Sequence, residues 1–507
     1  MDYVLHPWVN PGAIEKRAYQ ESVLETAKRG NTLCVLPTGL GKTSIAALLA
    51  AHRLEKDMNK KILFLAPTKP LVEQHRRSFA HMLKVGEDEL KTITGSDKPE
   101  ERKELYEKAD IIFSTPQTVR NDIKNGLFSL RNFSLCIFDE AHRCVGNYAY
   151  TYIAKRYMEQ ASDPLILALT ASPGSHREKI NEVKNRLFID YVEIRTREDQ
   201  DVRPYIQKLE QDYIEIELPR LIRSVIDYLA AVKNDRIKKL VSWRIINYDK
   251  INKTQILKLQ QDLAKKKTGF NMAAVSVLAE VLKVDHALIL AETQCLASLQ
   301  SYFYKLKEDK TRAVARLMKD KNFLDAIRHT NELIAEGKEH PKMEKLKELV
   351  AEQLKKDKFS HIIVFAQFRD TISEIYKQLQ TIYHAAPIEF IGQAKKKGKG
   401  LSQKEQTQIL NEFRMGFYNV LCASQVAEEG LDVVETNLVI FYEPTPSAIR
   451  KIQRTGRTAR TQTGKVVILI AKDTRDEAYH WSAHQKERKM KKTLYAMQQQ
   501  RTLSSVK

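Results

Sequence analysis

A segment rich in glycine and hydroxyl residues follows the first strongly apolar run and has the composition of a phosphate-binding loop. It consists of Leu36, Pro37, Thr38, Gly39, Leu40, Gly41, Lys42 and Thr43, and an apolar-periodic stretch follows it. Glycines let backbone N–H groups surround phosphates, Lys42 can bridge the β and γ phosphates, and the Thr43 hydroxyl can bind Mg²⁺. The strict loop pattern has glycine where this chain has Leu36. The spacing therefore predicts a nucleoside triphosphate site, with a chance glycine turn as the alternative.

Two neighbouring carboxylates, Asp139 and Glu140, come directly after the apolar run at 135–138. The carboxyl ends of strands in an open α/β sheet line the crevice where such sheets bind ligands. We expect Asp139 to hold Mg²⁺ through water, and Glu140 to orient and deprotonate the attacking water. The alternative is a plain surface turn, which the presence of Lys42 on a neighbouring strand disfavours.

An arginine-rich segment, Q-R-T-G-R-T-A-R at 453–460, places arginines three residues apart on one face of a helix. The nearest acidic residues are Glu443 and Asp473, so no local carboxylate neutralises Arg457 and Arg460. An arginine directed at a cleft can act as an arginine finger, which changes the rate by about 10³–10⁵. Taken alone, the segment could equally bind nucleic-acid phosphates.

Short apolar runs separated by longer amphipathic stretches indicate buried parallel sheets with helical crossovers. The runs lie at 32–37, 61–67, 110–115, 135–140 and 164–172, and again at 361–366, 388–391, 419–424, 437–442 and 465–471. The predicted fold class is α/β, with two doubly wound parallel-sheet domains and a mostly helical insert between them. The predicted segments are a first domain at 1–200, the insert at 201–338, a second domain at 339–483 and a basic tail at 484–507.

The insert is distinguished by its lack of helix breakers and by its charge. Residues 221–330 contain no proline and a single glycine, Gly269. They carry 15 Lys and 6 Arg against 8 Asp and 3 Glu, a net charge of +10. We expect contact with nucleic acid there, with Lys265, Lys266 and Lys267 as its densest cluster. The alternative is a solvated helical face.

The whole chain has 507 residues, a net charge of +20 and a pI near 9.4. This surplus favours a polyanionic partner, either nucleic acid or an acidic membrane. No apolar run approaches the roughly 18 residues needed to span a membrane, and no signal segment opens the sequence. The five cysteines form no C-x-x-C pair, which favours free thiols in a reducing cytosol over a secreted protein, a disulfide scaffold or a zinc site.

The motifs together resemble superfamily 2 helicases. The ordered set comprises a Q-type motif at 17–20, P-T-G-x-G-K-T, D-E-x-H, T-A-S at 170–172 and Q-R-x-G-R-x-x-R. Within that superfamily the chain resembles the family of archaeal Hef helicases and Fanconi anaemia M-type translocases. The matching strings lie at 36–43, 66–72, 138–143, 145–150, 169–175, 428–433 and 442–444. The string G-N-Y-A-Y at 146–150 is not required by ATP chemistry, which makes the resemblance specific.

The resemblance implies RecA-like domains, a thumb-like insert, ATP and Mg²⁺ as ligands, and an ATP-driven helicase or translocase that remodels forks and junctions during replication-fork repair. Further nucleotide-site residues implied by it are Arg17, Gln20 (for the adenine edge), His142, Gly430, Asp432 and Gln453. In the family the T-A-S motif couples hydrolysis to strand movement. Implied backbone-directed nucleic-acid contacts are Thr68, Lys69, Thr115, Pro116, Gln117, Arg369, Gln393, Ser424 and Gln425.

Two departures from the family pattern and two alternative functions accompany this interpretation. Ala459 replaces a glycine of the arginine motif, and Thr493 stands where an XPF-type nuclease has its metal-binding aspartate, so we expect no nuclease. The alternatives are a double-stranded-RNA-activated ATPase, which in relatives favours D-E-C-H, and a branch-binding scaffold that uses ATP as a switch. A further expectation concerns a protein partner. Gln500-x-x-Leu503 resembles the start of a peptide that binds a sliding clamp, but it lacks the aromatic pair of such peptides. The expected location is the cytoplasm, at the nucleoid.

Overall fold

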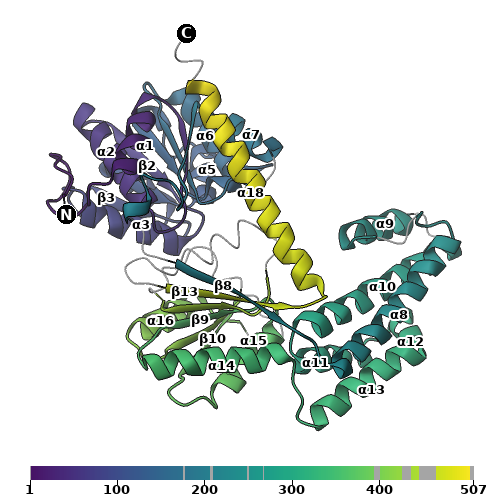
Figure 1. The fold of residues 1–507 in the computed structure, drawn as a ribbon. Coiled ribbons are helices and arrows are strands. Elements are labelled where there is room, and N and C mark those ends of the chain that lie inside the picture. Colours follow the sequence, from purple (N-terminus) through teal and green to yellow (C-terminus); the bar gives the residue numbers. More distant parts are fainter. Residues whose placement is uncertain are drawn as a thin grey trace.

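The computed structural model describes residues 2–174, 177–205, 209–247, 251–265, 268–392, 400–424, 436–444 and 464–502. Two α/β domains and a helical bundle are visible in this part of the chain (Figure 1). The bundle extends from the second domain, and a single long helix returns from that domain to the first (Figure 1). The predicted fold class, two parallel-sheet domains with a helical insert between them, is therefore confirmed.

The first domain contains a parallel sheet with the order β3-β4-β2-β5-β6-β1-β7. Its strands are β1 (Thr32–Val35), β2 (Lys61–Leu65), β3 (Leu90–Ile93), β4 (Ile111–Ser114), β5 (Phe133–Phe138), β6 (Ile166–Thr170) and β7 (Tyr191–Ile194). Its helices are α1 (Ala18–Arg29), α2 (Lys42–Lys56), α3 (Lys69–Met82), α4 (Pro99–Lys108), α5 (Pro116–Lys124), α6 (Ala149–Gln160) and α7 (Arg177–Arg186). Because every described strand pair is parallel, the loops that follow the strands share one edge of the sheet.

The second domain has a parallel sheet with the order β10-β11-β9-β12-β13-β8. Its strands are β8 (Leu209–Ile216), β9 (Ile362–Phe365), β10 (Pro387–Phe390), β11 (Val420–Ala423), β12 (Leu438–Phe441) and β13 (Gly464–Ala471). The helices α14 (Pro341–Lys356), α15 (Arg369–Leu379) and α16 (Gln403–Arg414) accompany them.

The bundle is made of helices α8 (Arg220–Ser242), α9 (Lys253–Lys265), α10 (Gly269–Thr293), α11 (Leu296–Lys307), α12 (Arg312–Leu317) and α13 (Lys321–Ala335). Its centre is a buried cluster that α8, α10, α11 and α13 share, and α9 packs against a second, smaller cluster near the end of α8. The described part of 221–330 is thus mostly helical, as the lack of helix breakers in this segment predicted.

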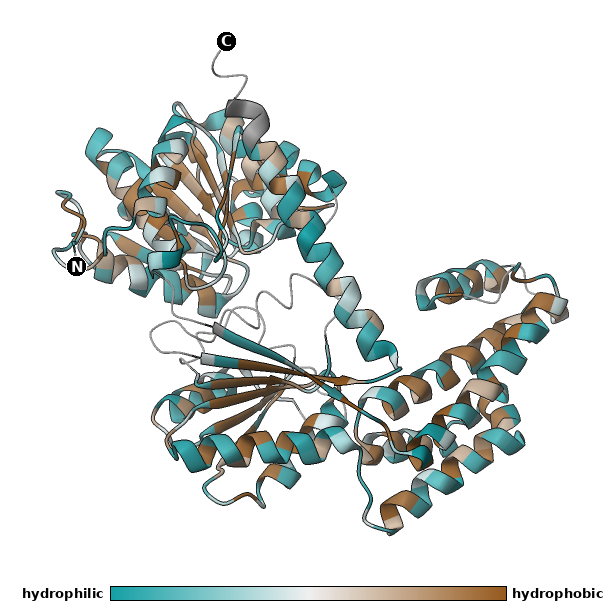
Figure 2. Ribbon diagram, in the orientation of Figure 1, coloured by the Kyte–Doolittle hydropathy of each residue, from teal (hydrophilic) through white to brown (hydrophobic). Residues whose placement is uncertain are grey.

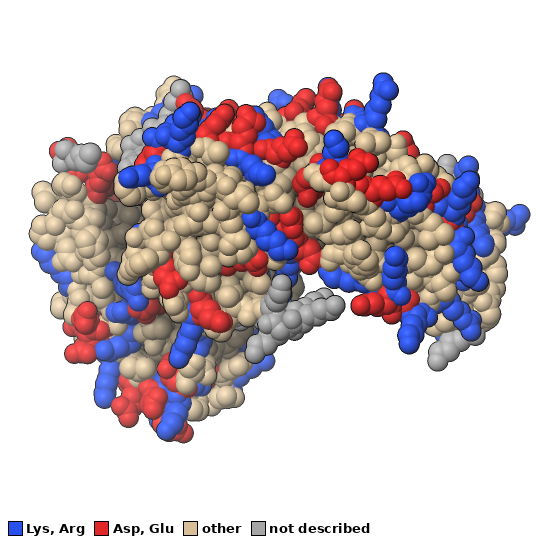
Figure 3. Space-filling view, turned by 90° about the horizontal axis from the view of Figure 1, so that it is seen from below, with Lys and Arg blue, Asp and Glu red and all other residues tan. Residues whose placement is uncertain are grey.

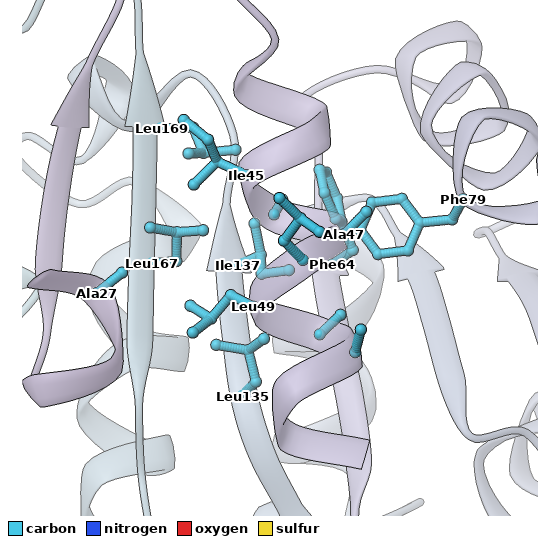
Figure 4. Packing of buried hydrophobic residues seen from close by; sticks show 14 of the residues in the cluster. Ala27, Ile45, Ala47, Leu49, Phe64, Phe79, Leu135, Ile137, Leu167 and Leu169 are labelled. Carbon is cyan, nitrogen blue, oxygen red and sulfur yellow. The ribbon is translucent and has the colours of Figure 1, made fainter. Parts of the chain in front are cut away.

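Apolar packing fixes the loop at 36–43 in place. In the buried cluster of Figure 4, Ile45 of α2 lies beside Leu169 of β6, Ala47 beside Phe64 of β2, and Leu49 beside Leu135 and Ile137 of β5. Figure 2 shows the same organisation for both domains, with apolar strands inside and mixed helices around them. The start of α2 is therefore held beside the end of β6, and its middle against β5.

The strands that the sequence did not predict, β3, β7 and β8, are all edge strands of their sheets. Their sequences, LKTI, YVEI and LEQDYIEI, interrupt apolar residues with polar or charged ones, so they lack the continuous apolar run on which the prediction relied. β8 also differs from the predicted segmentation, because it lies within 201–338 and yet pairs with β13 of the second sheet.

The expected basic tail also has a structure. Residues up to 502 belong to helix α18 (Arg475–Thr502), whose Met490, Leu494 and Met497 are buried in a core of the first domain. These three residues repeat at helical spacing among lysines, arginines and glutamines, so the tail has an apolar stripe that sequence analysis missed. None of the described helices combines the length and apolar composition needed to cross a membrane.

Candidate nucleotide-binding site

The predicted catalytic residues of the first domain meet at one edge of its sheet. Strands β5, β6 and β1 are neighbours, and each continues at its carboxyl end into one of the motifs. β1 leads into the loop at 36–43, β5 into Asp139 and Glu140, and β6 into the T-A-S motif at 170–172. This is the crevice position that open α/β sheets use for ligands.

At two positions of the loop at 36–43 the backbone lies in the left-handed region, which glycine adopts without strain. Gly39 has φ 85° and Gly41 has φ 73°. A Cβ atom on Gly41 would lie 2.3 Å from Nε2 of Gln20, so a side chain at this position would displace the end of the Gln20 side chain. The Lys42 ammonium donates to the carbonyls of Leu36 at 2.9 Å and Pro37 at 3.4 Å, which closes the loop around it.

The Q-type motif supports the loop from α1. Nε2 of Gln20 donates to the Leu40 carbonyl at 3.3 Å, and the hydroxyl of the buried Tyr19 donates to the same carbonyl at 2.8 Å. Tyr19 was not singled out from the sequence, although its place beside Gln20 was a signal. Arg17 precedes α1 and forms an ion pair with Glu15 at 2.8 Å.

His75 links the two residues predicted to bind Mg²⁺. Its Nε2 lies 2.9 Å from Oδ2 of Asp139, and its Nδ1 lies 3.5 Å from Oγ1 of Thr43. Burial by itself raises the pKa of Asp139, but the interaction with His75 and the charge of Lys42 outweigh it, so this pKa lies below its ordinary value. Sequence analysis missed His75, whose signal was a position on the buried face of α3 with Val72 and Phe79.

Glu140 lies at a strained position directly after Asp139. Its φ is 49°, in the left-handed region, and its Oε2 is buried without a hydrogen bond from the described residues. Nδ1 of His142 lies 3.2 Å from this oxygen and also 3.2 Å from Oγ1 of Thr170. The string at 146–150 contributes too, because the hydroxyl of Tyr150 donates to the Asp139 carbonyl at 2.7 Å.

The first domain thus fits a nucleoside triphosphate with Mg²⁺. Oγ1 of Thr38 and Oε2 of Glu140 are buried polar atoms without hydrogen bonds among the described residues. A bound ligand can supply the missing hydrogen bonds. Thr43 and Asp139 supply the oxygen ligands that Mg²⁺ prefers.

The nucleic-acid residues predicted in the first domain lie at the same edge, after β2 and β4. Thr68 directly precedes α3, where Oγ1 is buried and unpartnered among the described residues, and Lys69 forms a hydrogen bond with Ser96. Thr115 precedes α5 and its hydroxyl pairs with that of Thr118 at 2.8 Å, while Pro116 and Gln117 begin the helix.

The second domain and the insert contain the remaining candidates. Arg369 begins α15 and donates to the Gly392 carbonyl at 3.1 Å, and Oγ of the buried Ser424 has no hydrogen bond among the described residues. Lys265 ends α9 and pairs with Asp262 at 2.9 Å. Gln393, Gln425, Gly430, Asp432, Gln453, Arg457, Arg460, Lys266 and Lys267 lie outside the described residues, and so do Gln500's side chain and Leu503.

Comparison with known proteins covers both domains and the bundle. Residues 17–180 match the DEAD/DEAH box helicase family and residues 341–462 the helicase conserved C-terminal domain. Residues 221–337 match a family described as the helical bundle of a putative ATP-dependent RNA helicase.

Individual relatives extend over almost the whole chain. The helicase domain of Pyrococcus furiosus Hef is 42% identical, with a TM-score of 0.75, over 94% of this chain and 100% of that one. A putative ATP-dependent RNA helicase of Methanocaldococcus jannaschii is 40% identical over 98% of this chain and 63% of its own length. The ATP-dependent DNA helicase fml1 of Schizosaccharomyces pombe is 31% identical over 92% of this chain and 58% of its length. The chain thus spans less than two thirds of both curated relatives.

Proposed function

This chain belongs to the Hef family of superfamily 2 DEAD/DEAH-box helicases, and we propose that it is an ATP-driven motor that remodels branched DNA, such as forks and junctions, in replication-fork repair. The observation that carries the proposal is the meeting of Lys42, Asp139 and Glu140 at one sheet edge. The bundle between the two domains matches along with them, so the likeness extends beyond the ATP site.

In this proposal the first domain binds ATP. Backbone N–H groups between Thr38 and Thr43 surround the phosphates, Lys42 leaves its carbonyl partners to contact the β and γ phosphates, and Gln20 contacts the adenine edge. Thr43 and Asp139 would hold Mg²⁺, which would neutralise phosphate charge when bound. His75 orients Asp139 by its 2.9 Å contact.

Glu140 acts as the base. Its buried oxygen, which has no hydrogen bond among the described residues, accepts a hydrogen bond from the attacking water, orients it toward the γ phosphate and takes its proton. His142 stays within 3.2 Å of the same oxygen and limits the orientations of the carboxylate.

The second domain completes the site when the two domains close. Arg457 and Arg460 would then reach the γ phosphate as arginine fingers, with Gln453, Gly430 and Asp432 beside the nucleotide, as the family motif implies. Nucleotide state is thereby linked to the distance between the domains, which is the motion a translocating motor needs.

The nucleic acid would lie across the carboxyl-end loops of both domains. Thr68, Lys69, Thr115, Pro116 and Gln117 contribute from the first domain, and Arg369, Gln393, Ser424 and Gln425 from the second. Hydroxyls, amides and cations of this kind contact phosphates and carry no sequence information. The basic bundle supplies a further surface for a second arm of a branch.

A second candidate, a motor activated by double-stranded RNA, rests on a specific observation. Both the family matched by the bundle and the Methanocaldococcus relative have RNA in their descriptions. The two candidates are separated by the ATPase rate with forked DNA, linear duplex DNA, single-stranded DNA and duplex RNA at equal nucleotide concentration. The proposal expects the highest rate with forked DNA, whereas stimulation by duplex RNA alone would establish the second candidate.

The proposed partner is DNA, and the proposed location follows from it, in the cytoplasm at the nucleoid. A contact with a sliding clamp through 500–503 remains a weaker proposal. A pull-down with the clamp and a variant that lacks these residues tests it.

A further inference from the structure

Helix α18 connects the parts of the molecule that the ATP cycle has to move. It leaves the second domain after β13, contacts the last turns of α10 in the bundle and ends on the first domain (Figure 1). We propose that α18 is a positioning element for the catalytic carboxylate, with Met490 as the positioning residue that holds Ser172 and, through it, Glu140. This inference rests on the proposed function and adds a part of the chain to which no role in hydrolysis has been assigned.

The second half of α18 is fixed to the first domain. Met490, Leu494 and Met497 are buried in the same core as residues of β6 and β7. The hydroxyl of Tyr495 donates to the Asp199 carboxylate, with distances of 2.8 and 2.9 Å to its two oxygens. Nε2 of Gln498 donates to Glu193 at 3.0 Å. Buried apolar side chains and several polar contacts together keep this half in one position.

An unbroken series of contacts leads from α18 to the catalytic carboxylate. The hydroxyl of Ser172 donates to Sδ of Met490 at 2.9 Å. The backbone N–H of Ser172 donates to Oγ1 of Thr170 at 3.1 Å. That oxygen lies 3.2 Å from Nδ1 of His142, which in turn lies 3.2 Å from Oε2 of Glu140. A shift of Met490 therefore reaches the base through three residues.

The start of α18 is fixed to the second domain. The Asp476 carboxylate is fully buried and forms an ion pair with the equally buried Lys342 of α14. It also accepts the backbone N–H of Ala471, the last residue of β13, at 3.0 Å. Separating two buried opposite charges leaves both uncompensated, so the helix start moves with this domain.

The same helix start is tied to the bundle. Arg475 lies 2.8 Å from an Asp285 oxygen and 3.4 Å from a Glu292 oxygen, both on α10. Lys342 also donates to the carbonyl of Thr293, the last residue of α10, at 3.2 Å. Because α10 runs through the bundle, a load on the bundle is transmitted to the start of α18.

The middle of α18 makes the connection stiff. Residues such as His484 and Gln485 are exposed, yet the helix continues through them without interruption. A continuous helix transmits displacement along its axis, because bending it breaks backbone hydrogen bonds. When the second domain or the bundle moves, α18 therefore transmits a load to the contact between Met490 and Ser172.

The first test removes the contact and keeps the helix. Met490→Ala is compared with Met497→Ala, which empties a buried position of the same helix in the same core without touching the T-A-S motif. Met490→Leu keeps the volume but removes the sulfur that accepts the Ser172 hydroxyl, so it isolates the hydrogen bond from the packing. ATPase kcat and KM are measured with and without forked DNA, and Tm reports folding.

We expect Met490→Ala to lower kcat by about tenfold or more in both conditions, with KM for ATP within about twofold of wild type. Met490→Leu, which lacks the sulfur acceptor, should lower kcat in the same direction but by less, and Met497→Ala should lower Tm without this loss of kcat. Equal kcat losses in the two alanine variants, or no loss in either, would reduce α18 to a structural element. Because kcat is also measured without DNA, the effect of Met490→Ala can be detected even if forked DNA does not stimulate the wild type. A failure of this inference and a failure of the proposed function are therefore distinguishable.

The second test removes stiffness and keeps both anchors. The double variant His484→Gly/Gln485→Gly weakens the helix at exposed positions, and His484→Ala/Gln485→Ala is the matched control. We expect the glycine pair to lose at least half of the DNA-dependent increase in kcat while the alanine pair keeps it. If the glycine pair keeps full stimulation, the helix does not transmit the signal.

Discussion

At the scale of single residues, turnover depends most directly on Glu140. Its buried oxygen is the base in the proposed reaction, and glutamine has the same shape without basicity. We predict that Glu140→Gln binds ATP with unchanged affinity and lowers kcat by about 10²–10⁴-fold. Lys42→Ala should instead weaken nucleotide binding. Fluorescent nucleotide titration and a steady-state ATPase assay separate the two, and near-normal hydrolysis by Glu140→Gln would refute the assignment.

His75 gives a second prediction, because it touches both proposed Mg²⁺ ligands. Outer partners of this kind change metal affinity or activity by about 10- to 100-fold. His75→Ala should therefore raise the Mg²⁺ concentration for half-maximal ATPase by that factor. His81→Ala, at an exposed position of the same helix, is the control. The same Mg²⁺ dependence in both variants would leave His75 with a packing role only.

His340 gives a pH-dependent prediction. Burial and the nearby charge of Lys342 lower the pKa of His340 to about 3. In the unfolded chain the imidazole takes up a proton as pH falls from 7.5 to 5.5, while in the folded protein it stays neutral. The unfolded state therefore binds more protons at the lower pH, and the free energy of unfolding falls by about 1 kcal/mol between pH 7.5 and 5.5.

The variant His340→Asn checks this prediction. Its amide oxygen can still accept the Lys342 N–H, which His340 accepts at 3.3 Å, and it does not titrate. Between pH 7.5 and 5.5 the wild type should lose about 2–4 °C more in Tm than the variant. An equal loss in both proteins would show that His340 does not sense pH.

The residues of the ATP site could be predicted from the sequence where spacing alone determines them. The loop at 36–43 and the pair Asp139–Glu140 follow an apolar run, so strand and turn chemistry place them. His75, Tyr19 and Tyr150 could not be placed in this way, because their contacts depend on which faces of α3, α1 and α6 meet the loop.

At the scale of elements, periodicity was sufficient for the central strands and for the bundle. It failed for the edge strands β3, β7 and β8, whose apolar residues are interrupted by polar or charged ones. It also failed for the second half of α18, where the apolar stripe is one residue wide and lies among lysines, arginines and glutamines. The function of such an element follows from its partners, which only the folded chain reveals.

At the scale of the whole molecule, the charge of the bundle has to be divided between internal and external partners. Arg236 pairs with Glu280 at 2.7 Å and with Asp320 at 2.8 Å, so part of the basic surplus stabilises the bundle itself. In Figure 3, Lys and Arg side chains nevertheless project from the bundle lobe, with acidic residues among them. The net charge of +10 alone could not distinguish basic residues that form ion pairs inside the bundle from those that project outward.

The bundle gives the prediction that belongs to this scale. Replacing Lys265, Lys266 and Lys267 with glutamine should lower affinity for forked DNA and make its logarithmic salt slope less negative by about 0.9 per lost phosphate contact. Binding to single strands should change much less, because the strand-end loops are untouched. Lys355→Gln/Lys356→Gln on α14 is the control. Equal losses on both substrates would indicate a general electrostatic surface, and no loss a solvated spacer.

The most direct test of the central claim is strand displacement from a synthetic fork with one labelled strand, measured with and without ATP for the wild type and Glu140→Gln. If the chain is an ATP-driven motor on branched DNA, the wild type displaces the strand only with ATP, and Glu140→Gln binds the fork without displacing it. A wild type that hydrolyses ATP yet leaves the fork intact, or displacement that is equal without ATP, would contradict the claim.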